Sequence, residues 1–214
     1  MTKRLLSLLG EKHPLTACDA GEFSGLKAGG MTFTVEAYEA AGLGHVSVMH
    51  ASGFFGLMKM DTLIVNPTGA DLPLYSYDRI LAMGNDTLIA ELYDTTVGGF
   101  ASGELDGVLA GAAGLPDRDP GTHWYDGIRL SQSISKKGKK TESEAFDRLA
   151  EAHFAAWLGA KCAPLTDPEA KRAKSEAYVE GLLTHGGPST DVFRKALGQE
   201  KTEHLFRNVL FGTA

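Results

Sequence analysis

A succession of strand-like segments separated by short turns constrains this chain more than any other feature of its sequence. Helical periodicity is weak throughout the region, and Gly-, Pro- and Asn-rich turns interrupt it at short intervals. Connections this short join antiparallel neighbours, so the sequence predicts an antiparallel meander. The expected strands are Met31–Tyr38, His45–His50, Met58–Val65, Pro73–Ala82 and Thr87–Thr95.

The second half of the chain changes character. A Gly- and Ala-rich stretch after Val97 leads into a turn, and a further strand is expected over Trp124–Ser133. The basic segment Lys136–Lys140 is expected to be a loop that ends where a helix begins at Thr141. Apolar residues then recur at helical spacing to the C-terminus. Strands followed by helices predict an α+β fold in which helices cover an antiparallel sheet.

Length and composition fit one compact domain over residues 1–214. Hydrophobic residues make up 43% of the chain, enough for a substantial core, and no repeat or linker marks a second domain. The formal net charge of -6 gives no general basic field, so neither nucleic acid nor a membrane is an expected partner. Because the N-terminal leucines are too interrupted for a signal peptide, we expect a cytoplasmic location.

The standard catalytic and metal-binding signatures are missing from the sequence. It contains no P-loop, HExxH, GxSxG or dinucleotide-binding GxGxxG pattern. Cys18 and Cys162 are too far apart for a CxxC metal unit, although a disulfide between them stays open. His45 and His50 lie five apart on one expected strand, so they point to opposite faces and cannot share a metal ion. We expect no metal site.

One expected strand carries an acid in the middle of a mostly apolar face. Two-residue periodicity places Leu74, Ser76, Asp78 and Ile80 on the same side of Pro73–Ala82. If that face is covered, desolvation raises the pKa of the Asp78 carboxyl and makes it a proton donor near neutral pH. If the face is open to water, or if a Lys or Arg pairs with Asp78, the acid is an ordinary structural carboxylate.

The neighbouring strands offer further polar side chains. A meander could bring His50, Thr62 and Asp78 onto one sheet surface, where His50 donates or relays a proton. A histidine among valines is more often a packed, hydrogen-bonded residue. The methionines that share a face with Thr62 suit a flat, polarizable ligand, although such faces are also common in ordinary cores.

Four segments resemble the signatures of the ferredoxin-dependent bilin reductases. Asn66–Asp78 is similar to the central motif of that family, in which Leu-Pro precedes an apolar residue, an aromatic residue and, after two more positions, an Asp. Trp124 and the residues to Ser131 resemble its Trp-Gly-x-x-Phe-Ser segment. Pro164–Glu169 resembles its Pro-Leu-Ser-Asp-Pro-Glu helix start, and Phe193–Glu203 its C-terminal region. The segments occur in the family's order.

The resemblance implies an α/β/α sandwich, in which helices flank a central antiparallel sheet and a bilin lies between the sheet and the C-terminal helices. It implies no bound metal or flavin, because reduced ferredoxin supplies single electrons and pocket acids protonate the bilin. Asp78 falls on the family's central acid, and Thr62 and Ser76 are candidate substrate-binding residues on the same surface. Arg129 and Ser131 fall in a segment that approaches the bilin propionates, and a guanidinium can hold a carboxylate with two hydrogen bonds.

The chain departs from the acid set of that family. Thr62 stands where phycocyanobilin-forming members have a His, and His50 stands where they have a Glu, with Val48 in place of a further His. Gly186 stands where a C-terminal loop supplies an Asn or Asp. His50 or His185 is then a candidate for the missing proton donor, and the position of reduction stays open.

The basic segment has two interpretations. Lys136, Lys137, Lys139 and Lys140 could dock an acidic ferredoxin or meet the ligand propionates through contacts that depend on salt. They could equally form a solvated loop with no partner.

The sequence therefore predicts ferredoxin-dependent reduction of a bilin-like linear tetrapyrrole, with no bound cofactor. The alternative, which the incomplete acid set favours, is a non-catalytic tetrapyrrole-binding or carrier protein with the same fold. A third interpretation is a reductase or isomerase that acts on an unrelated planar substrate. A fold alone does not choose among these functions.

Overall fold

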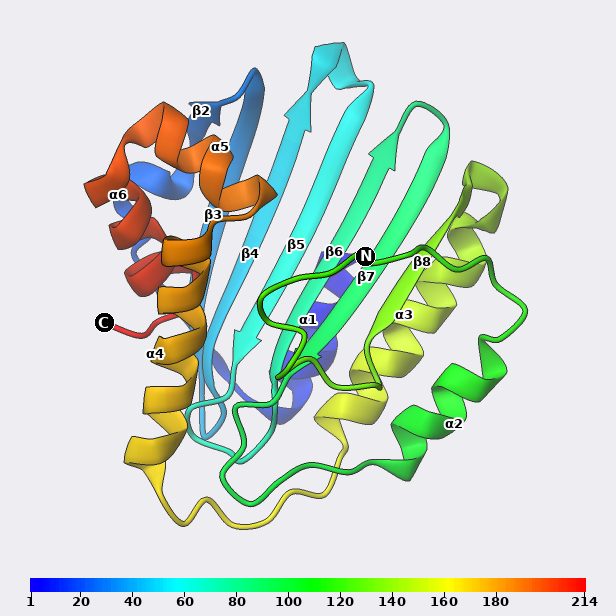
Figure 1. Ribbon diagram of the computed structural model, residues 1–214, viewed down its shortest axis with the longest axis vertical. Helices are drawn as coiled ribbons and strands as arrows, with labels where there is room; N and C mark the ends of the chain where they lie inside the picture. The colour runs from blue at the N-terminus through cyan, green and yellow to red at the C-terminus, as the bar shows by residue number, and fades with distance from the viewer.

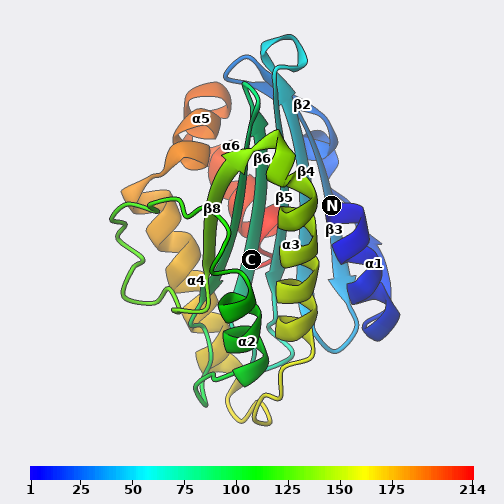
Figure 2. The ribbon, with the colours of Figure 1, turned by 90° about the vertical axis from the view of Figure 1, so that its right-hand side faces the viewer.

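The computed structural model describes residues 1–214 except for the side chain of Pro188. Three layers make up the structure, a central antiparallel sheet with helices on both faces (Figures 1 and 2). The strands are β1 (Leu15–Cys18), β2 (Leu26–Ala28), β3 (Met31–Ala40), β4 (Gly44–Gly53), β5 (Met58–Asn66), β6 (Leu74–Ala82), β7 (Asn85–Tyr93) and β8 (Ile134–Lys139). The helices are α1 (Thr2–Lys12), α2 (Gly103–Gly111), α3 (Ser143–Leu158), α4 (Pro168–His185), α5 (Pro188–Leu197) and α6 (Gln199–His204), and a π-helical turn follows at Leu205–Leu210.

The sheet runs in the order β1-β3-β4-β5-β6-β7-β8, with β2 paired to β3. Each neighbour from β3 to β7 is also the next strand along the chain, and all these pairs are antiparallel. The predicted meander is confirmed, and so is the α+β, α/β/α sandwich with its central antiparallel sheet.

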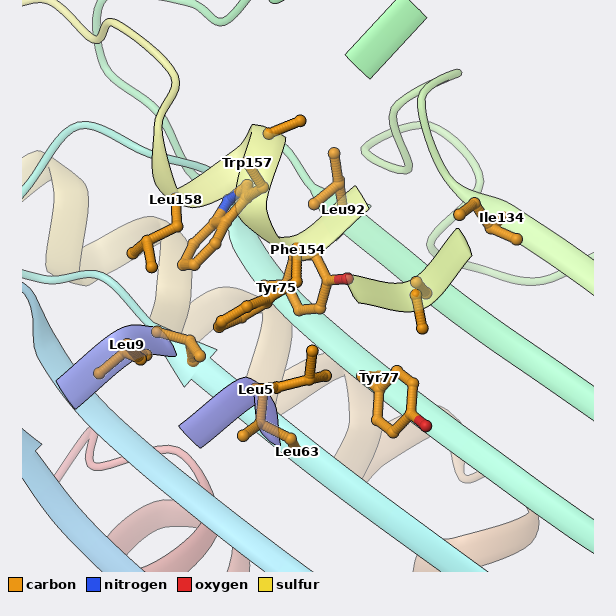
Figure 3. Packing of buried hydrophobic residues seen from close by; sticks show 14 of the residues in the cluster. Leu5, Leu9, Leu63, Tyr75, Tyr77, Leu92, Ile134, Phe154, Trp157 and Leu158 are labelled. Carbon is orange, nitrogen blue, oxygen red and sulfur yellow. The ribbon is translucent and has the colours of Figure 1, made fainter. Parts of the chain in front are cut away.

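One face of the sheet, here called the α3 face, is closed by α1, α2 and α3. Tyr75 and Leu63 of the sheet pack there against Leu5 of α1 and against Phe154 and Trp157 of α3 (Figure 3). All five side chains are fully buried. Burial of large apolar side chains on this scale is the main stabilising contribution to such a layer.

Two buried side chains of α3, Trp157 and His153, have hydrogen-bond partners on the α3 face. The Trp157 indole donates a hydrogen bond to the carbonyl oxygen of Pro73 over 3.1 Å. His153 Nε2 lies 2.8 Å from the carbonyl oxygen of Gln132, so it donates, and Nδ1 accepts from the Tyr75 hydroxyl at 3.0 Å. Burial lowers the pKa of His153 to about 4, which keeps the imidazole neutral at pH 7.

The opposite face, here called the α4 face, is covered by α4, α5 and α6 only over the half formed by β3 and β4 (Figure 1). Phe33 and Met49 pack there against Phe193 and Phe206. On the other half, Met60, Ile80 and Ile89 are each only partly buried. The two faces therefore differ in how far helices cover them.

Buried polar side chains fasten the C-terminal segment and the start of α4 to the sheet. Ser47 Oγ donates to the carbonyl oxygen of Leu210, and Asn66 Nδ2 donates to that of Phe211, both over 2.8 Å. Near the N-terminus of α4, Lys171 Nζ donates to the carbonyl oxygen of Leu72 and to Thr95 Oγ1. These contacts fix where α4 crosses the sheet.

Two expectations for the second half of the chain are wrong. Trp124–Ser133 is not a strand but a run of turns, with an isolated bridge between Arg129 and Tyr93. Lys136–Lys139 is not a loop, because Ile134–Lys139 forms β8 and pairs with β7. Charged residues are typical of edge strands, where they oppose pairing with other chains, and they hid this strand from a search for apolar alternation.

Lys136 shows why the basic segment is not simply a docking surface. Its side chain is buried on the α3 face, where Nζ donates to the carbonyl oxygens of Ala112 and Leu115 and forms an ion pair of 2.6 Å with Asp117. Lys137, Lys139 and Lys140 are exposed. The expectation that all these lysines face a partner is therefore wrong for Lys136.

The strands β1 and β2 and the helix α1 were not predicted from the sequence. Cys18 and Cys162 are both free thiols. No helix in the described part of the chain has the length and apolar character needed to cross a bilayer.

The neutral, buried His153 predicts an acid-sensitive contribution to stability. Its folded pKa is about 4 and its unfolded value 6.5, so the unfolded state binds more protons and stability falls as pH falls through this range. Between pH 7 and pH 5, His153 should lower the unfolding free energy of the wild type by about 2 kcal/mol. The variant His153→Gln should not show this decrease. Urea unfolding at the two pH values measures it; an identical pH dependence in both proteins would contradict the assignment.

Candidate functional site

Asp78 lies at the centre of the less covered half of the α4 face. The register places it on β6 directly opposite Thr62 of β5 and Ile89 of β7. Side chains of directly opposed residues share a face, and Thr62 Oγ1 donates a hydrogen bond of 2.5 Å to Asp78 Oδ1. The structure therefore brings together Asp78 and Thr62, as the meander pattern indicated, while the roles assigned to them stay predictions.

The surroundings of Asp78 are mostly apolar. Ile80 follows it on the same face of β6, Met60 and Ile64 lie diagonally across on β5, and Met49 of β4 stands opposite Thr62. Ser76, on the other side along β6, is partly buried and stands opposite Ile64. An apolar surface with Asp78 in its middle results.

The electrostatics of this surface favour the protonated form of Asp78. Desolvation raises the pKa of its carboxyl to about 6; the Thr62 hydrogen bond opposes this rise, and the negative charge of Glu91 adds to it. Among the ion pairs of the described side chains, none involves Asp78. The alternative of a structural ion pair with a Lys or Arg is therefore not what the structure contains.

A second acid, Glu91 of β7, lies on the same face and was missed from the sequence. It stands opposite Ser76, accepts a hydrogen bond of 2.5 Å from the Tyr93 hydroxyl and pairs with Arg129 at 3.1 Å. The signal was available, because Ile89, Glu91 and Tyr93 alternate along β7 as the residues around Asp78 do along β6.

Arg129 is engaged within the protein. Besides the contact with Glu91, its other terminal nitrogen lies 2.9 Å from Asp126 Oδ1, and its guanidinium lies 6.0 Å from the centre of the Tyr125 ring. An anionic ligand would meet Arg129 in competition with two carboxylates. These two carboxylates would weaken a contact between Arg129 and a propionate. Arg129 nevertheless lies beside the candidate site.

A cavity of about 300 Å³ extends the α4 face toward β8. Glu91, Asp126 and Arg129 line it together with serines of the Leu130–Ser135 segment, among them Ser131 and Ser135. Ser135 pairs with Ile89, so it lies in the same row across the sheet as Asp78. The cavity offers hydrogen-bonding groups beside the apolar surface, and Ser131 is exposed at its margin.

Aromatic side chains bound the site on the side of α4. The ring of Tyr178 of α4 lies 4.3 Å from that of Tyr93, and Trp124 packs 5.8 Å from Tyr178. Gly181 makes this possible, because a Cβ at that position would lie 2.2 Å from the Trp124 ring. The Trp124 segment is thus fastened against α4, and a planar ligand would find aromatic rings beside the apolar sheet.

His50 does not share the surface of Asp78, and that expectation is wrong. The register pairs His50 with Asp61, and its Nδ1 lies 2.7 Å from Asp61 Oδ1. Asp61 and Thr62 are consecutive residues of β5, so they point to opposite faces of the sheet. His50 therefore belongs to the α3 face, and Met49 is the β4 residue on the side of Asp78.

His185 lies at the C-terminal end of α4, at the margin of the aromatic group. Its side chain is exposed, and its ring centre lies 5.3 Å from that of Trp124. The structure places it next to the wall of the site rather than in the row of Thr62 and Asp78. Its role as a proton donor stays a prediction.

No protein-family model and no curated protein matches the chain. Among solved structures, it is similar to the crystal structure of selenomethionine-labelled phytochromobilin synthase from tomato in complex with biliverdin. The TM-score is 0.73 at 14% sequence identity, and the match covers 96% of this chain and 81% of that chain. At this identity the likeness concerns the fold. Over almost its whole length, the chain has the α/β/α fold of tomato phytochromobilin synthase.

Proposed function

We propose that this chain binds a bilin-like linear tetrapyrrole on the α4 face and reduces it with electrons from ferredoxin. Asp78 carries the proposal, because a partly buried acid with a raised pKa stands at the centre of an apolar surface. The tomato protein of the same fold binds biliverdin, which supports a ligand of this class. The segments that resemble bilin reductases point in the same direction.

The proposed chemistry needs a proton donor beside a flat, conjugated ligand. Reduction of one double bond takes two electrons and two protons. Ferredoxin supplies the electrons one at a time. With a pKa of about 6, Asp78 carries its proton in an appreciable fraction of molecules near neutral pH. Protonating a bilin nitrogen or carbonyl oxygen makes electron addition easier, and Thr62 then stabilises the carboxylate that remains.

The second candidate is a tetrapyrrole carrier that does not catalyse reduction. The observation in its favour is that the hydrogen-bond partner of Asp78 is the hydroxyl of Thr62, not a second titratable group. In addition, Glu91 is bound to Arg129 and Tyr93. A carrier would use the same apolar surface and would not need a proton supply.

Biliverdin titration separates these functions. We expect purified protein to change the visible absorption of biliverdin at a one-to-one ratio, and reduced ferredoxin to shift the spectrum further as double bonds are lost. Binding without turnover would identify the carrier. Spectra that stay unchanged at high biliverdin concentration would exclude both proposals.

Asp78→Asn should retain binding and lose turnover by at least about 100-fold, because a positioned acid typically contributes that much. In the wild type, kcat should fall as pH rises through about 6, since the protonated form is the active one. Single-turnover rates measured from pH 5 to pH 8 test both points. Glu176→Gln, an exposed change on α4, is the matched control, and normal turnover by Asp78→Asn would refute the role.

The same substitution should stabilise the fold at high pH. The folded pKa of Asp78 is raised from 3.8 to about 6, so its charge costs stability above pH 6, and this cost disappears below pH 3.8. We expect Asp78→Asn to gain about 3 kcal/mol in unfolding free energy at pH 8 and much less at pH 4. Denaturant unfolding measures the difference, and a variant that is less stable at pH 8 would show that Asp78 has a structural role.

A further inference from the structure

The most exposed large apolar side chains lie together at one end of the sheet. Phe54, Phe55 and Leu57 belong to the turn between β4 and β5, and they are 57%, 108% and 65% exposed. Met83, in the turn between β6 and β7, is 87% exposed. A hydrogen bond from the Met83 amide to the Leu57 carbonyl oxygen, 3.4 Å long, joins the two turns (upper end of the sheet in Figure 1).

These turns also hold unfavourable backbone conformations. In the described part of the chain, the non-glycine residues with positive φ are Phe54 (52°), Phe55 (57°) and Met83 (51°). Bulky side chains rarely adopt this left-handed region, whereas Gly and Asn enter it readily. These side chains are not buried, and their backbone conformation is unfavourable, so they do not stabilise the fold. This indicates that they contact a surface outside the chain.

Cationic side chains surround the apolar ones. Leu57, Leu81 and Met83 line a hollow of about 300 Å³ between the turns, and its charged lining residues are Lys59 and Lys140. Lys139 adds a further exposed cation at the end of β8, where it pairs with Asn85.

These lysines are free to meet an outside anion. None of the ion pairs among the described side chains involves Lys59, Lys139 or Lys140. At this end of the sheet, exposed apolar side chains are therefore combined with lysines that form no ion pair.

We propose that this end of the sheet docks on the surface of an anionic lipid bilayer. The membrane-docking tip, as defined here, comprises Phe54, Phe55, Leu57, Met83, Lys59, Lys139 and Lys140. Protruding apolar turns fit a deformable lipid surface, in which aromatic and aliphatic side chains enter the boundary between headgroups and acyl chains. The lysines then lie at the level of the anionic headgroups. A rigid protein partner would need matched pockets for two separate turns.

The negative net charge of the whole chain acts at long range, whereas the contact itself depends on the charges of the tip. At physiological ionic strength, charges more than about 8 Å apart in water are largely screened, so the lysines of the tip dominate at the point of contact. The formal charge of -6 speaks against long-range attraction to an anionic surface, and the expectation that excluded a membrane partner was drawn from that total. The docking depends on neither bilin binding nor reduction.

Vesicle co-sedimentation tests the proposal. The full chain should sediment with vesicles of phosphatidylcholine and phosphatidylglycerol in equal parts, and much less with phosphatidylcholine alone or at high salt. Phe54→Asn combined with Phe55→Asn should lower the partition coefficient at least about tenfold, which corresponds to about 1.4 kcal/mol, because two aromatic side chains are removed from the lipid. Lys59→Gln combined with Lys140→Gln should lower it several-fold.

Folding and specificity are controlled in the same experiment. Asn accommodates the left-handed conformation, so the Phe54→Asn/Phe55→Asn protein should have an unchanged or higher Tm. Val192→Asn and Lys195→Gln, both exposed positions on α5, should bind vesicles like the wild type. Failure to sediment with anionic vesicles would overturn the proposal, as would undiminished binding by the asparagine variant. A concentration-dependent dimer that this variant abolishes would instead assign the tip to self-association and would also overturn it.

Discussion

The pairing register between β5 and β6 decides what this protein can do. It sets Thr62 opposite Asp78 and, one residue away, Asp61 opposite Arg79. Because side chains alternate along a strand, a shift of one residue would send Asp78 into the closed α3 face. Tyr75 and Tyr77 are fully buried on that face, and they hold the register by packing against α1 and α3. The core on one side therefore positions the acid on the other.

The titratable groups His153 and Asp78 have opposite environments on the two faces of the sheet. On the α3 face, His153 has a hydrogen-bond partner at each ring nitrogen, and burial keeps it neutral. On the α4 face, Asp78 has one partner in Thr62 and an apolar surface around it, so its charge is unfavourable. A fold selected for stability alone would have no reason to keep an acid there. The contrast supports the proposed functional role of Asp78 and a packing role for His153.

The sequence predicts the architecture well and the site only in part. Two-residue alternation on β6 identifies the face of Asp78, but no single strand reveals its register with a neighbour, and for that reason His50 was placed on the wrong side. β8 was not predicted, because its lysines hide the alternation of buried and exposed side chains. Lys136 is buried and Lys137 is exposed. Trp124–Ser133 was wrongly predicted as a strand, because the position of Trp124 depends on Gly181 of a distant helix. The errors at His50 and Trp124 each involve a contact between segments that are separate in the chain.

The two acids of the α4 face are held in different environments, and this bears on how such a site works. Glu91 is surrounded by the guanidinium of Arg129 and the hydroxyl of Tyr93, whereas Asp78 receives a single neutral hydrogen bond. Glu91 also raises the pKa of Asp78 through its charge, although desolvation is the larger cause. In the proposed function, Asp78 carries the proton, and Glu91 and Arg129 are positioning residues. Glu91 raises the pKa of Asp78, and both residues line the polar cavity beside it.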